Sequence, residues 1–137
     1  MRFMLIVRSQ PEFEAETSPD PDPAVFEAMA RFHEELARAG VLLDAAGLHP
    51  SRKGWRVVHG AGAPRIVDGP FAEAKELIAG YTLIQARSRD EALEWSRRFP
   101  NPASAGREAV VEVRQLIDLD EFTPGDTVES FRRLLQP

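Results

Sequence analysis

Residues 68–76 (DGPFAEAKE) concentrate turn residues, an aromatic side chain and ionisable groups between two strand-like runs. A reversal of the chain is predicted at its start. Asp68 can bond to the backbone downstream, Gly69 tolerates positive φ, and Pro70 fixes φ at about −65°. The residues from Ala72 to Leu77 are good helix formers, but they leave room for only a turn or two. The stretch therefore predicts a turn followed by a short helical piece.

Strand patterns flank this turn on both sides. Residues 54–59 and 65–67 are rich in β-forming side chains and are joined by the Gly-rich segment 60–64, which predicts a β-hairpin. After the turn, residues 80–86 (GYTLIQA) predict a further strand. The turn therefore links a hairpin to the strand that follows it.

The N-terminal part predicts a strand, a connection and a helix. Residues 2–8 carry apolar side chains on both faces, so both faces of this strand are expected to be covered. Residues 10–23 are Pro-rich and acidic and predict a loop, either a surface connection or a lid over a cleft beside the first strand. The helix is predicted to begin with Asp22 as its N-cap and to end before Gly40; a strand over residues 41–48 follows.

Apolar residues recur at helical spacing in this helix: Val25, Met29, Phe32 and Leu36. His33 lies on the flank of the opposite face, beside Glu34. A histidine next to carboxylates suits a metal or acid–base site, but the amphipathic pattern favours a solvated face. We therefore expect His33 to face solvent.

The C-terminal part repeats the alternation of helix and strand. Ser88 and Glu91 predict a capping box that starts a helix, which ends at Pro100. Residues 110–117 predict the last strand. A final helix is predicted from Asp126, with a box-like Glu129 and an apolar face formed by Val128, Phe131, Leu134 and Leu135.

This order of elements predicts an α+β fold, a ferredoxin-like split βαβ unit with an inserted β-hairpin. Helices would cover one face of the sheet, and a twofold-related copy would bury the apolar opposite face. The expected assembly is therefore a homodimer that forms a dimeric α/β barrel. Residues 1–118 would form the domain, and residues 119–137 a C-terminal tail with a helix that docks on the core or on the partner subunit.

The composition limits the possible functions. The chain has 137 residues, 43% of them apolar, a net charge of −5 and no cysteine. Thiolate zinc sites, disulfides and cysteine nucleophiles are excluded, and the acidic balance opposes nucleic-acid binding. No metal, dinucleotide or haem motif is present, so no metal or cofactor is expected. The first residues do not resemble a signal peptide and the apolar runs are too short for a bilayer, which predicts a soluble cytoplasmic protein without membrane contact.

Residues 68–76 resemble the signature of the DGPF branch of the YCII-related domain family. The resemblance covers roughly residues 1–118 and includes residues 1–7, 40–42, 47–50, 80–81, 90–95 and 111–114. It implies a ferredoxin-like fold and a dimer. Related YCII-type domains include a dehydrochlorinase of aromatic degradation and carry a His and an Asp in their dimer clefts; some DGPF members are associated with extracytoplasmic-function sigma factors. The chain departs from the family in a longer, His-free segment at residues 99–106 and in its tail.

Candidate chemistry centres on the turn. Asp68 at a strand end is the best candidate acid or base, and His49 would complete a pair for lyase-like proton abstraction if both side chains approach one cleft. The predicted substrate-binding residues are Arg56, Phe71, Glu73 and Lys75. A purely structural role is the alternative, in which Asp68 caps the turn and Phe71 fills the core.

Two functions of different classes follow. The first is the binding or conversion of a small molecule in a cleft at the dimer interface. The second is a non-catalytic regulatory module that docks on another protein, such as a sigma factor, through residues 118–137. The sequence leaves open whether the protein is an enzyme.

Overall fold

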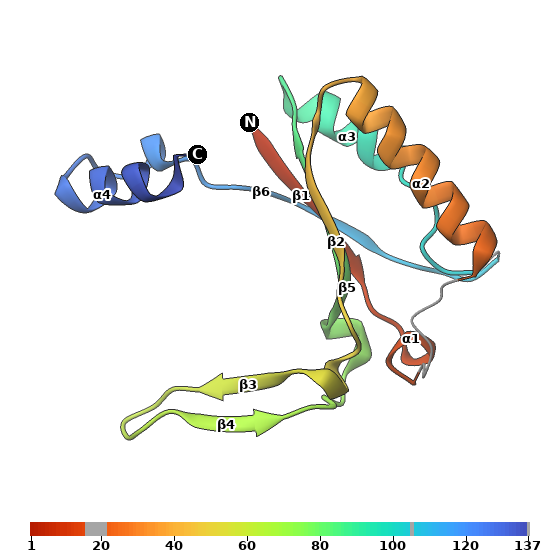
Figure 1. Cartoon of the computed structure of the whole chain (residues 1–137), viewed down its shortest axis with the longest axis horizontal. Coiled ribbons are helices and arrows are strands. Elements are labelled where there is room, and N and C mark those ends of the chain that lie inside the picture. The colour runs from red at the N-terminus through yellow and green to blue at the C-terminus, as the bar shows by residue number, and fades with distance from the viewer. Residues whose placement is uncertain (16–21, 105, 137) are drawn as a thin grey trace.

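The computed structural model describes residues 1–15, 22–104 and 106–136 (Figure 1). The strands are β1 (Arg2–Arg8), β2 (Leu42–Gly47), β3 (Trp55–Val58), β4 (Arg65–Asp68), β5 (Ile78–Gln85) and β6 (Val111–Gln115). The α-helices are α1 (Pro11–Ala15), α2 (Pro23–Arg38), α3 (Arg89–Arg97) and α4 (Asp126–Leu135). Three short 3-10 helices are η1 (Ser51–Lys53), η2 (Ala74–Glu76) and η3 (Leu119–Glu121).

The main sheet has the strand order β2-β5-β1-β6, with every neighbouring pair antiparallel. Strands β1 and β2 are therefore parallel and separated by β5, as in two interleaved βαβ units. In the described part of the chain, strands β3 and β4 form a separate two-stranded sheet, which extends away from the main sheet as the inserted hairpin (Figure 1). This arrangement agrees with the predicted ferredoxin-like α+β fold.

Helices α2 and α3 cover one face of the sheet (Figure 1). The core lies between these helices and the sheet. It contains three fully buried side chains: Leu5 of β1, Ile84 of β5 and Leu36 of α2. At the ends of α2, the Asp22 side chain accepts a hydrogen bond from the Ala24 N–H at 2.9 Å, and the chain then turns at Gly40 with φ of 73°. Both predicted ends of this helix are confirmed, and the core fixes α2 and α3 on one side.

The opposite face of the sheet is open in the described part of the chain (Figure 1). Met4 lies opposite Leu83, and Ile6 lies opposite Tyr81, so these four side chains share this face. They are half-buried. We call this surface the open face. It is the apolar surface for which the sequence predicts a second copy.

Three local predictions differ from the structure. A short helix, α1, forms within the segment predicted to be a loop, whose residues 16–21 lie outside the described ranges. Ser88 caps α3 as predicted, since its hydroxyl accepts a hydrogen bond from the N–H of Glu91 at 3.1 Å, but the Glu91 carboxylate accepts from the N–H of Arg87 and not from that of Ser88. Helix α4 has no side-chain cap, and the capping box of the tail is instead formed by Asp118 and Glu121 at η3. In the second and third cases, acidic side chains near a helix start accept hydrogen bonds from backbone N–H groups other than the expected ones.

Tyr81 gives a titration test of the open face. Its hydroxyl donates to Asp44 Oδ2 at 2.9 Å, and this hydrogen bond, with the charge of Asp44, raises the pKa of Tyr81 above its ordinary value of about 10. Because the folded-state pKa is raised, the contribution to stability is present below pH of about 10 and is lost as the pH rises through the raised pKa.

Tyr81 is the single tyrosine of the chain, so the ultraviolet absorbance of phenolate reports it alone. We expect the midpoint to lie above about 10 and to fall in Asp44→Asn, with circular dichroism confirming that both proteins are folded. A wild-type midpoint at or below the ordinary value would contradict the hydrogen bond.

Candidate functional site

The turn at residues 68–76 is held against η1 by Ser51. The Ser51 hydroxyl accepts a hydrogen bond from the N–H of Phe71 at 3.0 Å and donates to the carboxylate of Glu14. The backbone N–H of Ser51 also donates to Glu14, at 3.0 Å. One serine therefore ties together the turn, η1 and α1.

Gly69 is required for a reason that the sequence does not suggest. A Cβ atom built on Gly69 would lie 1.8 Å from the carbonyl oxygen of Ser51. Its backbone does not use the left-handed region, since the positive φ values among described residues are those of Gly40 and Gly106. The turn needs glycine because two backbone segments approach closely, so the expected use of positive φ is wrong.

Three predicted binding residues come together beside this turn. Phe71, Glu73 and Lys75 line a pocket of about 530 Å³ together with Glu14 and other residues of α1. The guanidinium of Arg56, the fourth predicted binding residue, lies 3.8 Å from the centroid of the Phe71 ring. All four predicted binding residues are therefore close together. Phe71 is half-buried and lies outside the buried core, which contradicts its alternative role as a core residue.

The two predicted catalytic residues, Asp68 and His49, do not join the four predicted binding residues. Asp68 and His49 are both exposed, and neither lines the pocket beside Phe71. Among the described residues, no hydrogen bond or ion pair joins Asp68 to His49. Their acid–base role stays a prediction.

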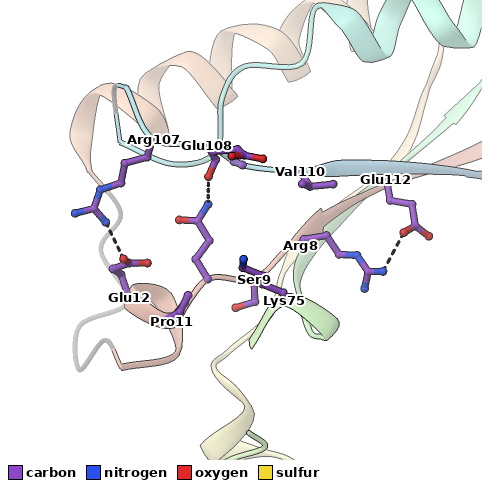
Figure 2. A pocket seen from close by; sticks show the side chains of 11 residues that line it. Arg8, Ser9, Pro11, Glu12, Lys75, Arg107, Glu108, Val110 and Glu112 are labelled. Carbon is purple, nitrogen blue, oxygen red and sulfur yellow. Dashed lines mark hydrogen bonds and ion pairs between the residues drawn. The ribbon is translucent and has the colours of Figure 1, made fainter. Parts of the chain in front are cut away.

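A second pocket, of about 590 Å³, lies where β1 leaves the sheet (Figure 2). Its charged side chains pair with one another: Arg8 with Glu112 at 3.0 Å, and Arg107 with Glu12 at 3.3 Å. Lys75 also lines it. Since most of its charges are already compensated within the protein, this pocket offers little preference for a ligand of either sign.

A third pocket lies between the N-terminal half of α2 and the sheet, and we call it the α2 pocket. Its volume is about 460 Å³. Phe26 and Met29 of α2 form one wall, and the small residues Ala45 and Gly80 form the other. Beneath the C-terminal half of α2, the large side chains of Phe3, Leu5 and Ile84 fill the space between helix and sheet. Beneath the N-terminal half, Ala45 and Gly80 are too small to fill it, which leaves the pocket.

His33 is the main polar side chain in the α2 pocket. Its Nδ1 lies 2.7 Å from the carbonyl oxygen of Met29, and its Nε2 lies 2.7 Å from Oγ1 of Thr82. A carbonyl only accepts, so Nδ1 carries a proton. In the neutral ring, Nε2 then accepts from the Thr82 hydroxyl. Both ring nitrogens are therefore engaged.

The expectation that His33 faces solvent is wrong. The side chain is half-buried and makes edge contacts with the rings of Phe32 and Phe99. The sequence contains one signal for this position: His33 follows Met29 by four residues, so it lies on the same side of the helix as that apolar residue. Its partner Thr82 lies 49 residues away in the sequence and carries no such signal.

Two further properties concern metals and membranes. Within residues 1–15, 22–104 and 106–136, no three His, Cys, Asp or Glu side chains are grouped so that they would hold a metal ion. Across the same part of the chain, each helix is too short or too polar to cross a membrane.

The strand order and the two helices on one face define a ferredoxin-like α+β protein. The chain belongs to the YCII-related domain family, whose model matches residues 1–119. It is also similar to an uncharacterised protein of Rhizobium meliloti, with 36% identity over 84 residues that cover 61% of this chain and 68% of that protein. The predicted family is confirmed, and the DGPF branch stays a prediction.

Proposed function

We propose that the protein is a homodimer that binds a small, largely apolar molecule in the α2 pocket of each copy. The observation that carries this proposal is the pocket itself. Its volume of about 460 Å³ lies within the range typical of small-molecule sites, and its walls are mainly apolar with few polar groups. The imidazole of His33 would orient a ligand by a hydrogen bond.

The geometry of His33 favours binding over catalysis at this site. A general base needs a free lone pair, and the only lone pair of the neutral ring is directed at the Thr82 hydroxyl. A ligand with a hydroxyl or amide N–H would compete with Thr82 for that nitrogen. Lyase-like chemistry by Asp68 and His49 remains a separate proposal for the turn, where Arg56 and Lys75 supply positive charge.

The homodimer is supported by the open face. Met4, Ile6 and Leu83 place apolar side chains on a surface that no helix of the described chain covers. The hairpin and α4 extend on the same side of the sheet (Figure 1). A second copy that faces this surface would bury these side chains and form the dimeric α/β barrel.

A matched pair of substitutions on α2 tests the pocket. We expect Ala30→Trp, which adds an indole at the exposed edge of the α2 pocket, to abolish thermal stabilisation by any ligand found in a panel of small aromatic and aliphatic acids, alcohols and amides. Ala37→Trp makes the same change two turns further along the same side of α2, at an equally exposed residue that does not line the pocket, and should preserve the stabilisation. A ligand at a hundred times its dissociation constant should stabilise the wild type by about 2.7 kcal/mol.

The same panel separates the candidate sites. Stabilisation that survives Ala30→Trp but is lost in Asp68→Asn would contradict the α2 pocket and place the ligand at the turn. If no compound stabilises the wild type, the proposal of a small-molecule site is contradicted. The second candidate function, docking on another protein, would then be favoured by the exposed apolar side chains of α4.

A further inference from the structure

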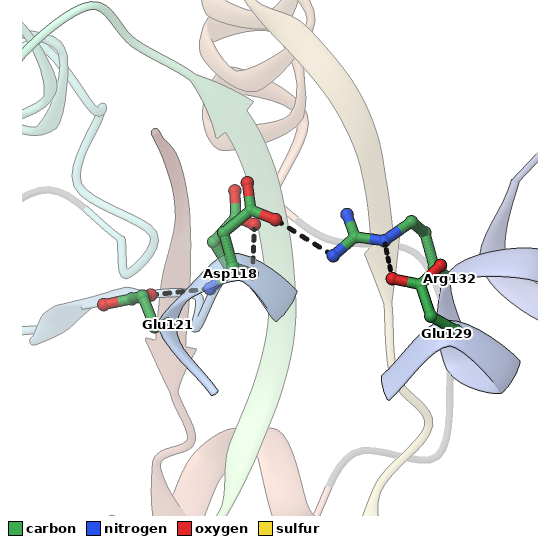
Figure 3. Close-up of polar contacts among 5 residues, drawn as sticks. Asp118, Glu121, Glu129 and Arg132 are labelled. Carbon is green, nitrogen blue, oxygen red and sulfur yellow. Dashed lines mark hydrogen bonds and ion pairs between the residues drawn. The ribbon is translucent and has the colours of Figure 1, made fainter. Parts of the chain in front are cut away.

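Polar contacts within the C-terminal tail join η3 to α4 (Figure 3). Arg132 of α4 donates from Nη2 to Asp120 of η3 at 3.0 Å and from Nε to Glu129 at 3.4 Å. The hydrogen bond to Asp120 raises the pKa of Arg132 above its ordinary value. Asp118 and Glu121 form a capping box around η3. These contacts fix α4 against η3. They are all polar, so the apolar face of α4 takes no part in them.

That face of α4 is largely bare. Phe131, Leu134 and Leu135 are 51%, 77% and 70% exposed. Their spacing of three and four residues places Phe131 next to both leucines along the helix. Helix α4 therefore presents an apolar surface that the described part of its own chain does not bury.

The hairpin presents a second bare apolar surface. Val57 lies directly opposite Ile66 in the β3–β4 ladder, and Trp55 lies two residues from Val57, so the three side chains share one face. They are 64% (Trp55), 46% (Val57) and 58% (Ile66) exposed. A hairpin of two strands gains little stability alone, so a partner for this face is expected.

The two surfaces are complementary in charge. Residues 51–68, which include the whole hairpin, contain four basic residues and one acidic residue, whereas residues 118–136 contain five acidic and two basic residues. Opposite charges around apolar centres favour this pairing over hairpin against hairpin or tail against tail, where like charges would meet.

The placement of the two surfaces indicates how they meet. The hairpin leaves one end of the main sheet and the tail leaves the other, and both extend on the side of the open face (Figure 1). A twofold rotation that exchanges the two ends of the sheet brings the hairpin of one copy to the tail of the other. Such an isologous arrangement makes the contact twice.

We propose that, in the dimer, α4 of each copy docks its apolar face on the β3–β4 hairpin of the other copy. This inference rests on the proposed homodimer. Trp55, Val57 and Ile66 would receive the side chains of Phe131, Leu134 and Leu135, and the basic hairpin would face the acidic tail.

The absence of cysteine from the chain allows a direct test by cross-linking. Two full-length variants are made, Val57→Cys and Leu134→Cys, each at an exposed position. The two are mixed, allowed to exchange subunits, and treated with a short bis-maleimide. We expect a covalent heterodimer of the two variants as the main product. Leu93→Cys on α3 is the matched control and should give no product with Val57→Cys.

Light scattering on the same samples separates the two proposals. A dimeric mass without the Val57–Leu134 product would overturn the exchange of tails while preserving the dimer. Cross-linking of Leu134→Cys to itself as the main product would also overturn it, because tail would then meet tail. A monomeric mass would overturn the dimer and the exchange together.

Discussion

Replacing Gly69 by alanine should lower the free energy of unfolding by about 3 kcal/mol, the upper part of the range for overpacking. The added Cβ would lie 1.8 Å from the carbonyl oxygen of Ser51 and 2.6 Å from its carbonyl carbon, so backbone atoms must move. Ser51 cannot move freely, because its N–H and hydroxyl bind Glu14 and Phe71. The strain therefore spreads through η1, α1 and the turn.

Urea denaturation followed by tryptophan fluorescence measures this effect. Gly62→Ala is the matched control, since a Cβ at Gly62 meets no atom within 4 Å. We expect Gly62→Ala to change the free energy of unfolding by less than about 0.5 kcal/mol. An equally small change for Gly69→Ala would show that the turn does not approach Ser51 as closely as described.

The fold was largely predictable because each main element leaves a local signal in the sequence. The alternation in residues 2–8, the stripe from Val25 to Leu36 and the β-formers of residues 80–86 each depend on side chains a few positions apart. Once the order β-α-β-hairpin-β-α-β is known, few topologies remain. The error at the cap of α4 arose where several acidic residues of the tail could serve as caps, and Asp118 and Glu121 cap η3 instead.

The candidate site was less predictable because its geometry depends on distant parts of the chain. The α2 pocket exists because Ala45 and Gly80, on two neighbouring strands, are small where α2 passes over them. His33 faces the sheet because Thr82 offers a hydroxyl there. The clash that makes Gly69 necessary comes from Ser51, in another turn. Each of these contacts joins residues that are far apart in the chain. Such contacts leave no periodic pattern or fixed spacing in a single sequence.

Leu83→Asp should convert the proposed dimer to a monomer. Leu83 lies on β5 in the middle of the open face, opposite Met4. A twofold interface would bury two new carboxylates, one from each copy, without partners. We expect the dissociation constant to rise by at least about a hundredfold, equivalent to about 2.7 kcal/mol, measured by sedimentation equilibrium over a range of protein concentrations.

Leu93→Asp on α3 makes the same chemical change on the other side of the sheet, at a side chain that is 38% exposed, and should leave the dimer intact. A wild-type protein that is monomeric at micromolar concentration would contradict the dimer without any variant. If the wild type is dimeric but Leu83→Asp dimerises equally well, the interface lies elsewhere. The open face would then not be the dimer interface. The contact between the hairpin and α4 depends on that interface, so the exposed side chains of both elements would need another partner.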